Sequence, residues 1–287
     1  MGLALGQAGG GEGEGRLLFV HGFTGCKEEF ADLVEAFAGR GWHAAAVDLR
    51  GHGHSEHPEG EGSYDVKAFA GDVLGAARAL GWDRFHLVGH SMGGAVAQRI
   101  AVDHPGRLHS LVLMSTFHGP LVIDPALVAL GVAVVNQGGM EALYQALAAR
   151  RETDPAAVAA RARIEESRPG YGELADSKLL ACAPAMWTAM APRFPVWPDN
   201  LAEVAGLATP TLVVVGADDQ TMRADCERLA ATIPAARLAL LEGVRHSPHL
   251  EAPEVCLAVL VDFLGAPAGR ASSAGGPPRR PPPRPRT

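Results

Sequence analysis

The chain has 287 residues with a net charge of -7, and 47% of its residues are hydrophobic. This length can bury the core of one large α/β domain or of two small ones. The mildly acidic charge gives no reason to expect nucleic acid or an anionic membrane as a partner. The longest apolar stretch, 126–135, is too short and broken to span a membrane. The four cysteines lie far apart without a CxxC spacing, so we expect reduced thiols rather than a zinc site or disulfides.

The two ends of the chain differ in composition from the part between them. Residues 9–15 read GGGEGEG, and the N-terminus lacks the basic start and apolar core of a signal peptide, so we expect a cytoplasmic protein. Residues 268–287 end in PPRRPPPRPRT, which is typical of a disordered or polyproline-like tail; we expect it to be solvated rather than bound to an SH3-like groove. We therefore predict a flexible or degenerate strand at 1–16 and a disordered tail at 266–287.

Short apolar runs alternate with helical periodicity between these ends. Residues 17–20 (LLFV) predict a buried strand, and the apolar residues of 30–37 then recur at helical spacing. The same pattern continues along the chain. It predicts strands at 44–47, 85–88, 111–114, 211–215 and 238–241, and helices at 66–80, 93–102 and 253–264.

Strands that alternate with helices indicate a mostly parallel sheet, and strands that are apolar throughout fit a sheet covered on both faces. The alternation stops between about 117 and 200, where we expect helices at 140–151, 155–166 and 173–190. We therefore predict an α/β core formed by 17–117 and 201–265, with a helical cap at 118–200 inserted between its halves.

The strongest motif is Gly-His-Ser-Met-Gly at 89–93, which follows a predicted strand and opens a predicted helix. This context is the one that a nucleophile elbow requires. Ser91 would stand on a tight strained turn, where side chains at 89 and 93 would collide with neighbouring backbone. The start of the helix also favours developing negative charge.

A second motif, HGFTG at 21–25, directly follows the first predicted strand. An acyl-transfer enzyme needs two backbone N–H groups aimed at the oxyanion. We expect them to come from Phe23 in this loop and from Met92, the residue after the proposed nucleophile.

The acid and base candidates also follow predicted strands. Asp219 comes just after 211–215, and His246 comes just after 238–241, so both lie where ligands bind in open α/β sheets. His246 would accept the Ser91 proton, and Asp219 would hold the imidazole in the required tautomer. Asp218 is the alternative acid. His249 follows His246 by three residues, but a third ligand is lacking, so we expect no metal site.

Taken together, these motifs resemble the α/β-hydrolase family with an inserted cap. The resemblance covers 17–264, and its marks are HGFTG, DLRGHGHS (48–55), GHSMGG (89–94), PTLVVVGADD (210–219) and GVRHSPHLEAPE (243–254). The resemblance implies a mostly parallel sheet flanked by helices and a serine hydrolase; the family's Gly-x-x-Asp spacing favours Asp219 over Asp218. Similar proteins carry a hairpin of two strands before the HG loop. Only residues 2–7 could supply the extra strand here, so we expect it to be missing or shortened.

We expect hydrolysis of a carboxylic ester or related acyl bond in a small-molecule substrate, without a metal or organic cofactor. Ser91 disfavours the family's dehalogenases and epoxide hydrolases, whose nucleophile is Asp. The same triad also serves lactonases, C–C bond hydrolases, cofactor-free haloperoxidases and the pyruvate-eliminating synthase of menaquinone biosynthesis. A non-catalytic receptor is a further alternative.

Candidate substrate-binding residues lie in the predicted cap. Trp187 and His118 are the two that we select, with core packing as an equal alternative for Trp187. Cap arginines bound to substrate carboxylates would support the pyruvate-eliminating alternative, whereas arginines on a solvated helix face would not. The cap segment contains Arg150, Arg151, Arg161, Arg163, Arg168 and Arg193.

Overall fold

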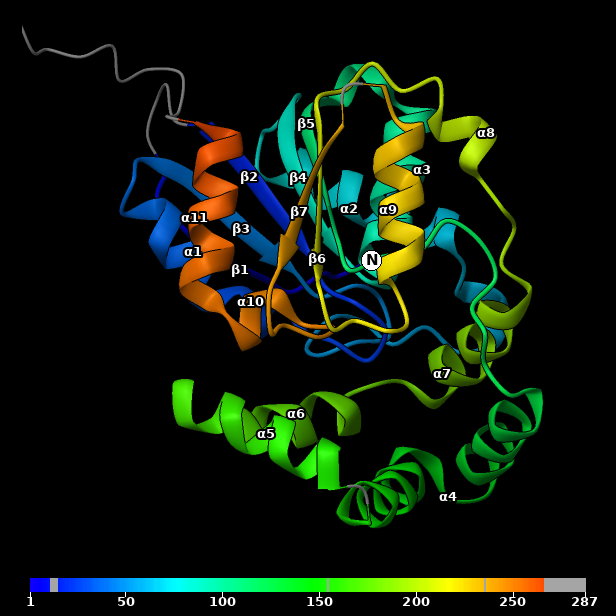
Figure 1. Ribbon diagram of the computed structural model, residues 1–287. Helices are drawn as coiled ribbons and strands as arrows, with labels where there is room; N and C mark the ends of the chain where they lie inside the picture. The colour runs from blue at the N-terminus through cyan, green and yellow to red at the C-terminus, as the bar shows by residue number, and fades with distance from the viewer. Residues whose placement is uncertain (11–14, 154, 235, 266–287) are drawn as a thin grey trace, which may run out of the picture.

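A seven-stranded sheet in the order β1-β3-β2-β4-β5-β6-β7 forms the centre of the molecule in the computed structural model, which describes residues 1–10, 15–153, 155–234 and 236–265 (Figure 1). β1 pairs antiparallel with β3, and every other neighbouring pair is parallel. The predicted α/β fold is therefore confirmed. The strands are β1 (Leu5–Ala8), β2 (Gly15–Val20), β3 (Trp42–Val47), β4 (Phe85–His90), β5 (Leu108–Met114), β6 (Thr211–Gly216) and β7 (Arg237–Leu241).

The inner strands are buried on both faces, as their unbroken apolar runs predict. In β2, Leu18 and Val20 belong to one hydrophobic cluster, and Leu17 and Phe19 belong to the other. Successive side chains point to opposite faces of a strand, so one short run contributes to two cores. Five longer helices pack against the two faces. α1 (Ala31–Ala38) and α11 (Pro253–Leu264) cover one face, and α2 (Val66–Ala79), α3 (Met92–Asp103) and α9 (Arg223–Thr232) cover the other (Figure 1).

Short helical turns connect these elements at the edges of the sheet. They are η1 (Lys27–Phe30), η2 (Glu61–Ser63), η3 (Pro105–Arg107), α8 (Leu201–Val204) and α10 (Pro248–Glu251).

The first strand is present but short. β1 has four residues, and Leu5 lies opposite Val47 of β3. The backbone N–H of Ala4 donates to Ser55 Oγ at 2.8 Å, which holds the chain just before the strand. The predicted core boundary at residue 17 is therefore too late, because β1 and the first two residues of β2 lie before it. Residues 11–14 of the predicted flexible segment and the predicted tail at 266–287 lie outside the described residues.

Between β5 and β6 the chain forms a separate group of helices, residues 118–200, which we term the helical insertion. It consists of α4 (Pro125–Glu152), α5 (Pro155–Ser167), α6 (Tyr171–Leu180), α7 (Pro184–Met190) and η4 (Ala191–Val196). Figure 1 shows it beyond one end of the sheet. This is the end at which the strands finish, because the insertion hydrogen-bonds to the loops after β2 and β3, for example from Ala183 N–H to Gly51 O at 2.8 Å.

Two details of the insertion differ from the prediction. The expected helix at 173–190 is two helices, α6 and α7, because Pro184 starts the second one and cannot continue the first. The helix expected at 140–151 begins much earlier, at Pro125, and its backbone leaves the helical region at Gly139 (φ 66°, ψ -161°). By length and composition α4 is the one described helix apolar and long enough to cross a membrane, and 17% of its most apolar window is buried.

All four cysteines are free and buried. Burial raises the pKa of the Cys182, Cys226 and Cys256 thiols to about 12, and it also raises the pKa of Cys26. Each thiol therefore stays protonated at neutral pH, as expected for cysteines that serve as small apolar side chains.

Candidate active site

Ser91 stands on the tight turn between β4 and α3. Its φ of 53° and ψ of -119° place it outside the regions that a non-glycine residue usually adopts. A Cβ at position 89 would overlap the Gly93 carbonyl, and a Cβ at position 93 would lie 2.5 Å from the carbonyl oxygens of Val20 and His21. The turn can therefore form only because both flanking positions are glycine, as the motif predicted.

The three predicted triad residues lie in hydrogen-bonding contact although the chain separates them widely. His246 Nε2 is 3.2 Å from Ser91 Oγ, and His246 Nδ1 is 3.0 Å from Asp219 Oδ2. In the neutral imidazole, Nδ1–H donates to the carboxylate, and Nε2 is free to accept the serine proton. All three residues follow strands that end at the same edge of the sheet, namely β4, β6 and β7.

Asp219 is the carboxylate that contacts the imidazole. It is buried, and its other oxygen accepts N–H groups from Thr221 at 3.2 Å and Met222 at 3.1 Å. Burial alone would raise the pKa of this carboxyl, but the hydrogen bonds from His246 and the backbone outweigh burial and lower the pKa. The alternative acid, Asp218, is exposed to solvent.

A second histidine fixes the position of His246. His90 is buried, and its Nε2–H donates to the His246 carbonyl at 2.9 Å. Its ring lies 5.0 Å from the His246 ring and 4.7 Å from the His249 ring. Burial lowers the pKa of His90 well below its ordinary value and that of His249 to about 3, so both rings are neutral at pH 7. The histidine of the elbow motif thus joins the nucleophile turn to the backbone of the proposed base.

The HGFTG loop lies beside the elbow. His21 accepts the Leu49 N–H at Nε2 (3.1 Å), its Nδ1–H donates to Gly22 O (2.8 Å), and Gly25 N–H donates to Gly22 O (3.0 Å). Among the described residues, the N–H groups of Phe23 and Met92 donate to no other group. These are the two donors that the sequence assigns to an oxyanion.

Trp187, one of the two predicted substrate residues, lies against this loop. Its ring centroid is 6.1 Å from that of Phe23, and the Phe194 ring approaches Phe23 edge-on at 5.0 Å. Trp187 is only partly buried. An aromatic wall supplied by the helical insertion therefore adjoins one of the two candidate oxyanion donors.

His118, the other predicted substrate residue, is placed differently. Its ring is buried, with Nδ1 3.3 Å from Asp199 Oδ1 and Nε2 3.3 Å from Asp225 Oδ1. Both ring nitrogens therefore face carboxylates of the protein itself. These contacts explain the buried position of His118 without a substrate, and we do not retain it as a substrate residue.

Sequence reasoning missed Thr116, which supports the elbow from behind. Its hydroxyl donates to Ser91 O at 2.7 Å, and its backbone N–H is 3.3 Å from Cys226 Sγ on α9. A threonine two residues after a strand carries no recognisable signal, and α9 itself was not predicted. Only the fold brings these residues to the nucleophile.

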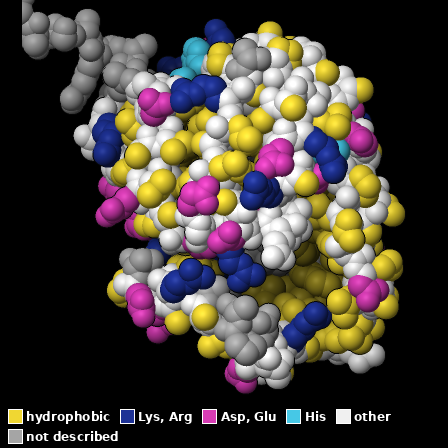
Figure 2. All heavy atoms as spheres, in the orientation of Figure 1, with side chains coloured by type: hydrophobic (Ala, Val, Ile, Leu, Met, Phe, Trp, Pro, Cys, Tyr) yellow, Lys and Arg dark blue, Asp and Glu magenta, His cyan; other side chains and the backbone are white. Residues whose placement is uncertain are grey.

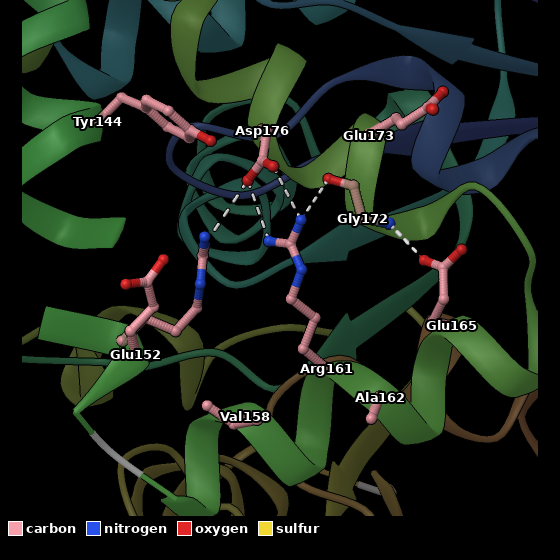
Figure 3. A pocket seen from close by; sticks show the side chains of 10 residues that line it. Tyr144, Glu152, Val158, Arg161, Ala162, Glu165, Gly172, Glu173 and Asp176 are labelled. Atoms are coloured by element: carbon pink, nitrogen blue, oxygen red, sulfur yellow. Dashed lines mark hydrogen bonds and ion pairs between the residues drawn. The ribbon is translucent and has the colours of Figure 1, made fainter. Parts of the chain in front are cut away.

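The helical insertion contains a cleft of about 670 Å³ (Figure 3). Arg161 binds Asp176 through two hydrogen bonds at 3.0 and 2.8 Å, and Arg151 lies 3.6 Å from the same carboxylate. Figure 2 shows that the surface over the insertion is hollowed and that the wall of the hollow is largely hydrophobic. The cleft is lined by Tyr144, Arg151, Glu152, Val158, Arg161, Ala162, Glu165, Gly172, Glu173 and Asp176, and these include no member of the proposed triad.

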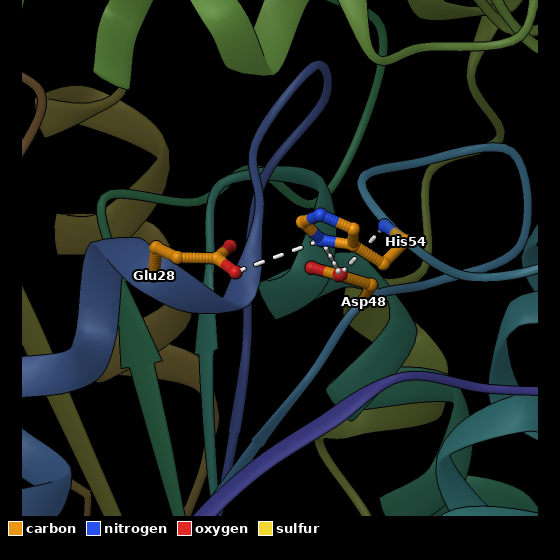
Figure 4. A group of neighbouring side chains, drawn as sticks. All are labelled: Glu28, Asp48 and His54. Carbon is orange, nitrogen blue, oxygen red and sulfur yellow. Dashed lines mark hydrogen bonds and ion pairs between the residues drawn. The ribbon is translucent and has the colours of Figure 1, made fainter. Parts of the chain in front are cut away.

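One group of side chains has the composition of a metal site. Glu28, Asp48 and His54 bring their ligand atoms within 4.8 Å of one another (Figure 4). The Lys27 ammonium, however, already binds all three, at 2.5 Å from Glu28 Oε1, 2.9 Å from Asp48 Oδ2 and 3.1 Å from His54 Nδ1. A lysine of the protein supplies the cation that this cluster needs, so these residues do not fit a metal ion.

Comparison with known proteins shows the family to which the chain belongs. A family model described as "alpha/beta hydrolase fold" matches residues 15–253. The chain is 30% identical to the 2-(acetamidomethylene)succinate hydrolase of Mesorhizobium japonicum over 87% of this chain and 88% of that one. The solved enol-lactonase of Burkholderia xenovorans superposes with a TM-score of 0.76 at 25% identity, covering 91% of this chain and 96% of that one.

A further similarity is local. The match to the fluoroacetate dehalogenase of a Burkholderia species is 38% identical over 108 residues, which is 37% of this chain and only 35% of the dehalogenase.

Proposed function

Because the chain belongs to the α/β-hydrolase fold family, we propose that it is a serine hydrolase that cleaves a carboxylic ester or related acyl bond of a small to medium substrate. The observation that carries the proposal is the unbroken contact from Ser91 Oγ through the His246 ring to Asp219 Oδ2. A strained turn that holds a half-buried serine against such a pair is expected where the serine hydroxyl is to be activated.

The reaction follows from this geometry. Ser91 Oγ attacks the carbonyl carbon while His246 Nε2 takes the hydroxyl proton, and the Phe23 and Met92 N–H groups stabilise the oxyanion. His246 then gives the proton to the leaving alkoxide, which departs as an alcohol and leaves an acyl-serine. Water, deprotonated by His246, attacks the acyl-serine and releases the acid and Ser91. Asp219 stays ionised throughout and stabilises the imidazolium.

We propose that the helical insertion acts as a cap and gives the site an apolar wall. Trp187 and Phe194 pack against Phe23, whose N–H is the proposed donor to the oxyanion. An apolar acyl or alcohol group beside the scissile carbonyl would meet these rings. The similarity to an enol-lactonase supports an ester-type substrate, and Ser91 in place of Asp argues against dehalogenation by an Asp nucleophile.

The contacts of the insertion argue against pyruvate elimination. That reaction would use cap arginines to bind substrate carboxylates, but Arg151 and Arg161 already pair with Asp176. Arg168 donates to the carbonyls of Glu28 and Glu29. These three cations are thus engaged by the protein, so they do not supply the carboxylate site that pyruvate elimination would need.

The first test is covalent labelling with a fluorophosphonate probe, followed by peptide mass spectrometry and by hydrolysis of p-nitrophenyl esters. We expect the adduct on Ser91, and we expect Ser91→Ala and His246→Ala to abolish both labelling and hydrolysis. Asp218→Asn, at the exposed neighbour of the proposed acid, is the matched control. A folded protein that neither labels at Ser91 nor hydrolyses any ester of an acyl-length series would contradict the proposal.

A further inference from the structure

A buried ion pair joins the helical insertion to the sheet domain. Lys178 Nζ, on α6, lies 2.5 Å from Glu29 Oε1, on η1. The Glu29 side chain is 3% exposed and that of Lys178 is 19% exposed, so solvent screens this pair far less than a surface pair. The two residues are 149 positions apart in sequence.

The second oxygen of Glu29 lies beneath the HGFTG loop. Glu29 Oε2 accepts the Cys26 N–H at 3.3 Å. A Cβ built at Gly25 would be only 2.5 Å from the same oxygen and 2.9 Å from His21 Cβ. The carboxylate is therefore packed against the backbone of the loop that carries the Phe23 N–H.

A second cation of the insertion binds the same turn. Arg168 donates to the carbonyls of Glu28 and Glu29 at 2.9 and 3.2 Å, and its Nε lies 3.3 Å from Asp32 Oδ2. Arg168 thus holds the backbone of η1, whereas Lys178 holds the side chain that reaches the loop. Both cations of the insertion therefore bind the turn that directly follows the HGFTG loop.

The neutral surroundings of Glu29 make Lys178 its necessary partner. Burial would raise the pKa of the Glu29 carboxyl, but the Lys178 ammonium, with smaller contributions from His249 and His90, outweighs burial and lowers the pKa to about 2. Nearby, His249 stacks on Phe30, and among the described residues neither of its ring nitrogens has a hydrogen-bond partner. At pH 7 the His90 and His249 rings are neutral, so the Lys178 ammonium is the group that balances the negative charge of Glu29.

We propose that Lys178 is a positioning residue, whose ammonium fixes the Glu29 carboxylate under the HGFTG loop so that docking of the helical insertion sets the Phe23 N–H for catalysis. The proposal rests on the hydrolase function proposed above. Without the ammonium, the buried carboxylate is unpaired and is expected to turn towards water. This movement breaks its bond to the Cys26 N–H and loosens the loop, whereas a neutral amide at position 29 can stay buried and accept that N–H.

Four variants separate positioning from general stability. Lys178→Met leaves the buried charge of Glu29 unbalanced, and Lys178→Arg keeps a cation there. The double variant Glu29→Gln/Lys178→Met removes both charges, while the amide oxygen of the substituted side chain can still accept the Cys26 N–H. Arg161→Met is the control, because it breaks an ion pair that lies wholly inside the insertion.

We expect Lys178→Met to lower kcat for p-nitrophenyl butyrate about ten-fold or more, since a displaced oxyanion donor stabilises the transition state less. KM should change by less than about three-fold, because the loss falls on the transition state rather than on substrate binding. Lys178→Arg and the double variant should recover most of kcat. A kcat of folded Lys178→Met within about two-fold of the parent would overturn the proposal, as would a double variant as slow as Lys178→Met.

Hydrogen exchange tests the same idea without substrate. We expect the amides of 22–26 to exchange about ten-fold faster in Lys178→Met than in the parent, and at the parental rate in the double variant and in Arg161→Met. Unchanged exchange in Lys178→Met would overturn the positioning role. If instead the parent shows no Ser91-dependent hydrolysis, the proposed function fails, while the exchange experiment still decides the role of Lys178.

Discussion

The sheet domain and the helical insertion differ in how completely they bury their apolar side chains. Most residues of the inner strands β2 to β6 are buried, and their helices cover both faces. The insertion instead leaves several large apolar side chains in solvent. These are Val122, Leu127, Leu130, Leu147, Val158, Leu180 and Val196. The proposed triad therefore stands on the part of the molecule with the most burial, and the proposed cap is the part with the least.

This division has a physical reason. A nucleophile on a strained turn needs neighbours that resist relaxation, and a close-packed sheet supplies them. A covering segment must admit and release substrate, which requires contacts that can open and reform. Near the site, the insertion contacts the sheet domain through the charged groups of Lys178 and Arg168 and through the packing of Trp187 and Phe194 on Phe23.

The largest expected effect tests the chemistry placed on the sheet. Asp219→Asn keeps the shape of the side chain but removes the charge and favours the wrong imidazole tautomer, so kcat should fall by about 10⁴. Asp218→Asn, one residue away and exposed, should stay within about two-fold of the parent. Steady-state hydrolysis of one p-nitrophenyl ester measures both. Equal losses in the two variants would remove Asp219 from the triad.

The next effect compares packing in the two regions. Phe19 in β2 is fully buried, with the Phe30 ring 5.1 Å away, so Phe19→Ala should lower the free energy of unfolding by about 3–5 kcal/mol. Leu130 in α4 is 60% exposed, and Leu130→Ala should lower it by less than about 1 kcal/mol. Urea unfolding followed by circular dichroism gives both values. If Leu130→Ala and Phe19→Ala lowered the free energy of unfolding equally, α4 would be buried in solution.

A smaller effect concerns the pH dependence of the contact between the regions. The pKa of Glu29 is lowered from 4.5 to about 2, so its carboxylate stabilises the fold above pH 4.5, and this contribution is lost as pH falls towards 2. In the parent, the free energy of unfolding should fall between pH 4.5 and pH 2. In Glu29→Gln, this fall should be smaller by about 2–3 kcal/mol.

Urea unfolding at a series of pH values measures how the free energy of unfolding depends on pH. If the free energy of unfolding falls equally steeply in the parent and in Glu29→Gln, Glu29 does not titrate as described. Other titratable groups that face Glu29 also contribute to this pH dependence. The titratable groups around it are Lys178, His249, His90, His21, Cys26, Cys182 and Tyr171.

The smallest effect concerns the Trp187 ring beside the HGFTG loop. A Cβ at Gly131 of α4 would overlap the Trp187 ring, so Gly131→Ala should push the indole towards Phe23 and narrow the space there. We expect kcat/KM for a bulky ester to fall about five-fold more than that for an acetate ester, a difference of roughly 1 kcal/mol. Gly75→Ala, which meets nothing within 4 Å, is the control. An identical change for both esters would place the Trp187 wall away from the substrate.

The sheet could be predicted from the sequence because a strand that is buried on both faces has an unbroken run of apolar residues. The candidate site could be predicted because its residues directly follow those runs: Ser91 after β4, Asp219 after β6 and His246 near the end of β7. Chain position thus identified Ser91 and His246 and left Asp218 and Asp219 as candidate acids, between which the family's Gly-x-x-Asp spacing selected the residue that contacts His246.

Two helices and one ion pair could not be predicted, because no sequence pattern indicates them. Helix α9 was missed because only Cys226 and Leu229 of its ten residues are buried, too few to show a helical period. The first half of α4 is apolar without a polar face, since it exposes apolar side chains, and a period cannot appear in it. The pairing of Lys178 with Glu29 depends on two elements that only the folded chain brings together.

The four buried thiols can report the local opening of the segments in which they lie. Only the thiolate reacts quickly with alkylating reagents, so a buried protonated thiol is silent until its surroundings open. Cys26 directly follows the HGFTG loop, Cys182 lies at the junction of α6 and α7, Cys226 lies behind the turn that carries Ser91, and Cys256 lies in α11. Alkylation resolved by residue would therefore rank the opening of these four segments in one unlabelled, unmutated protein.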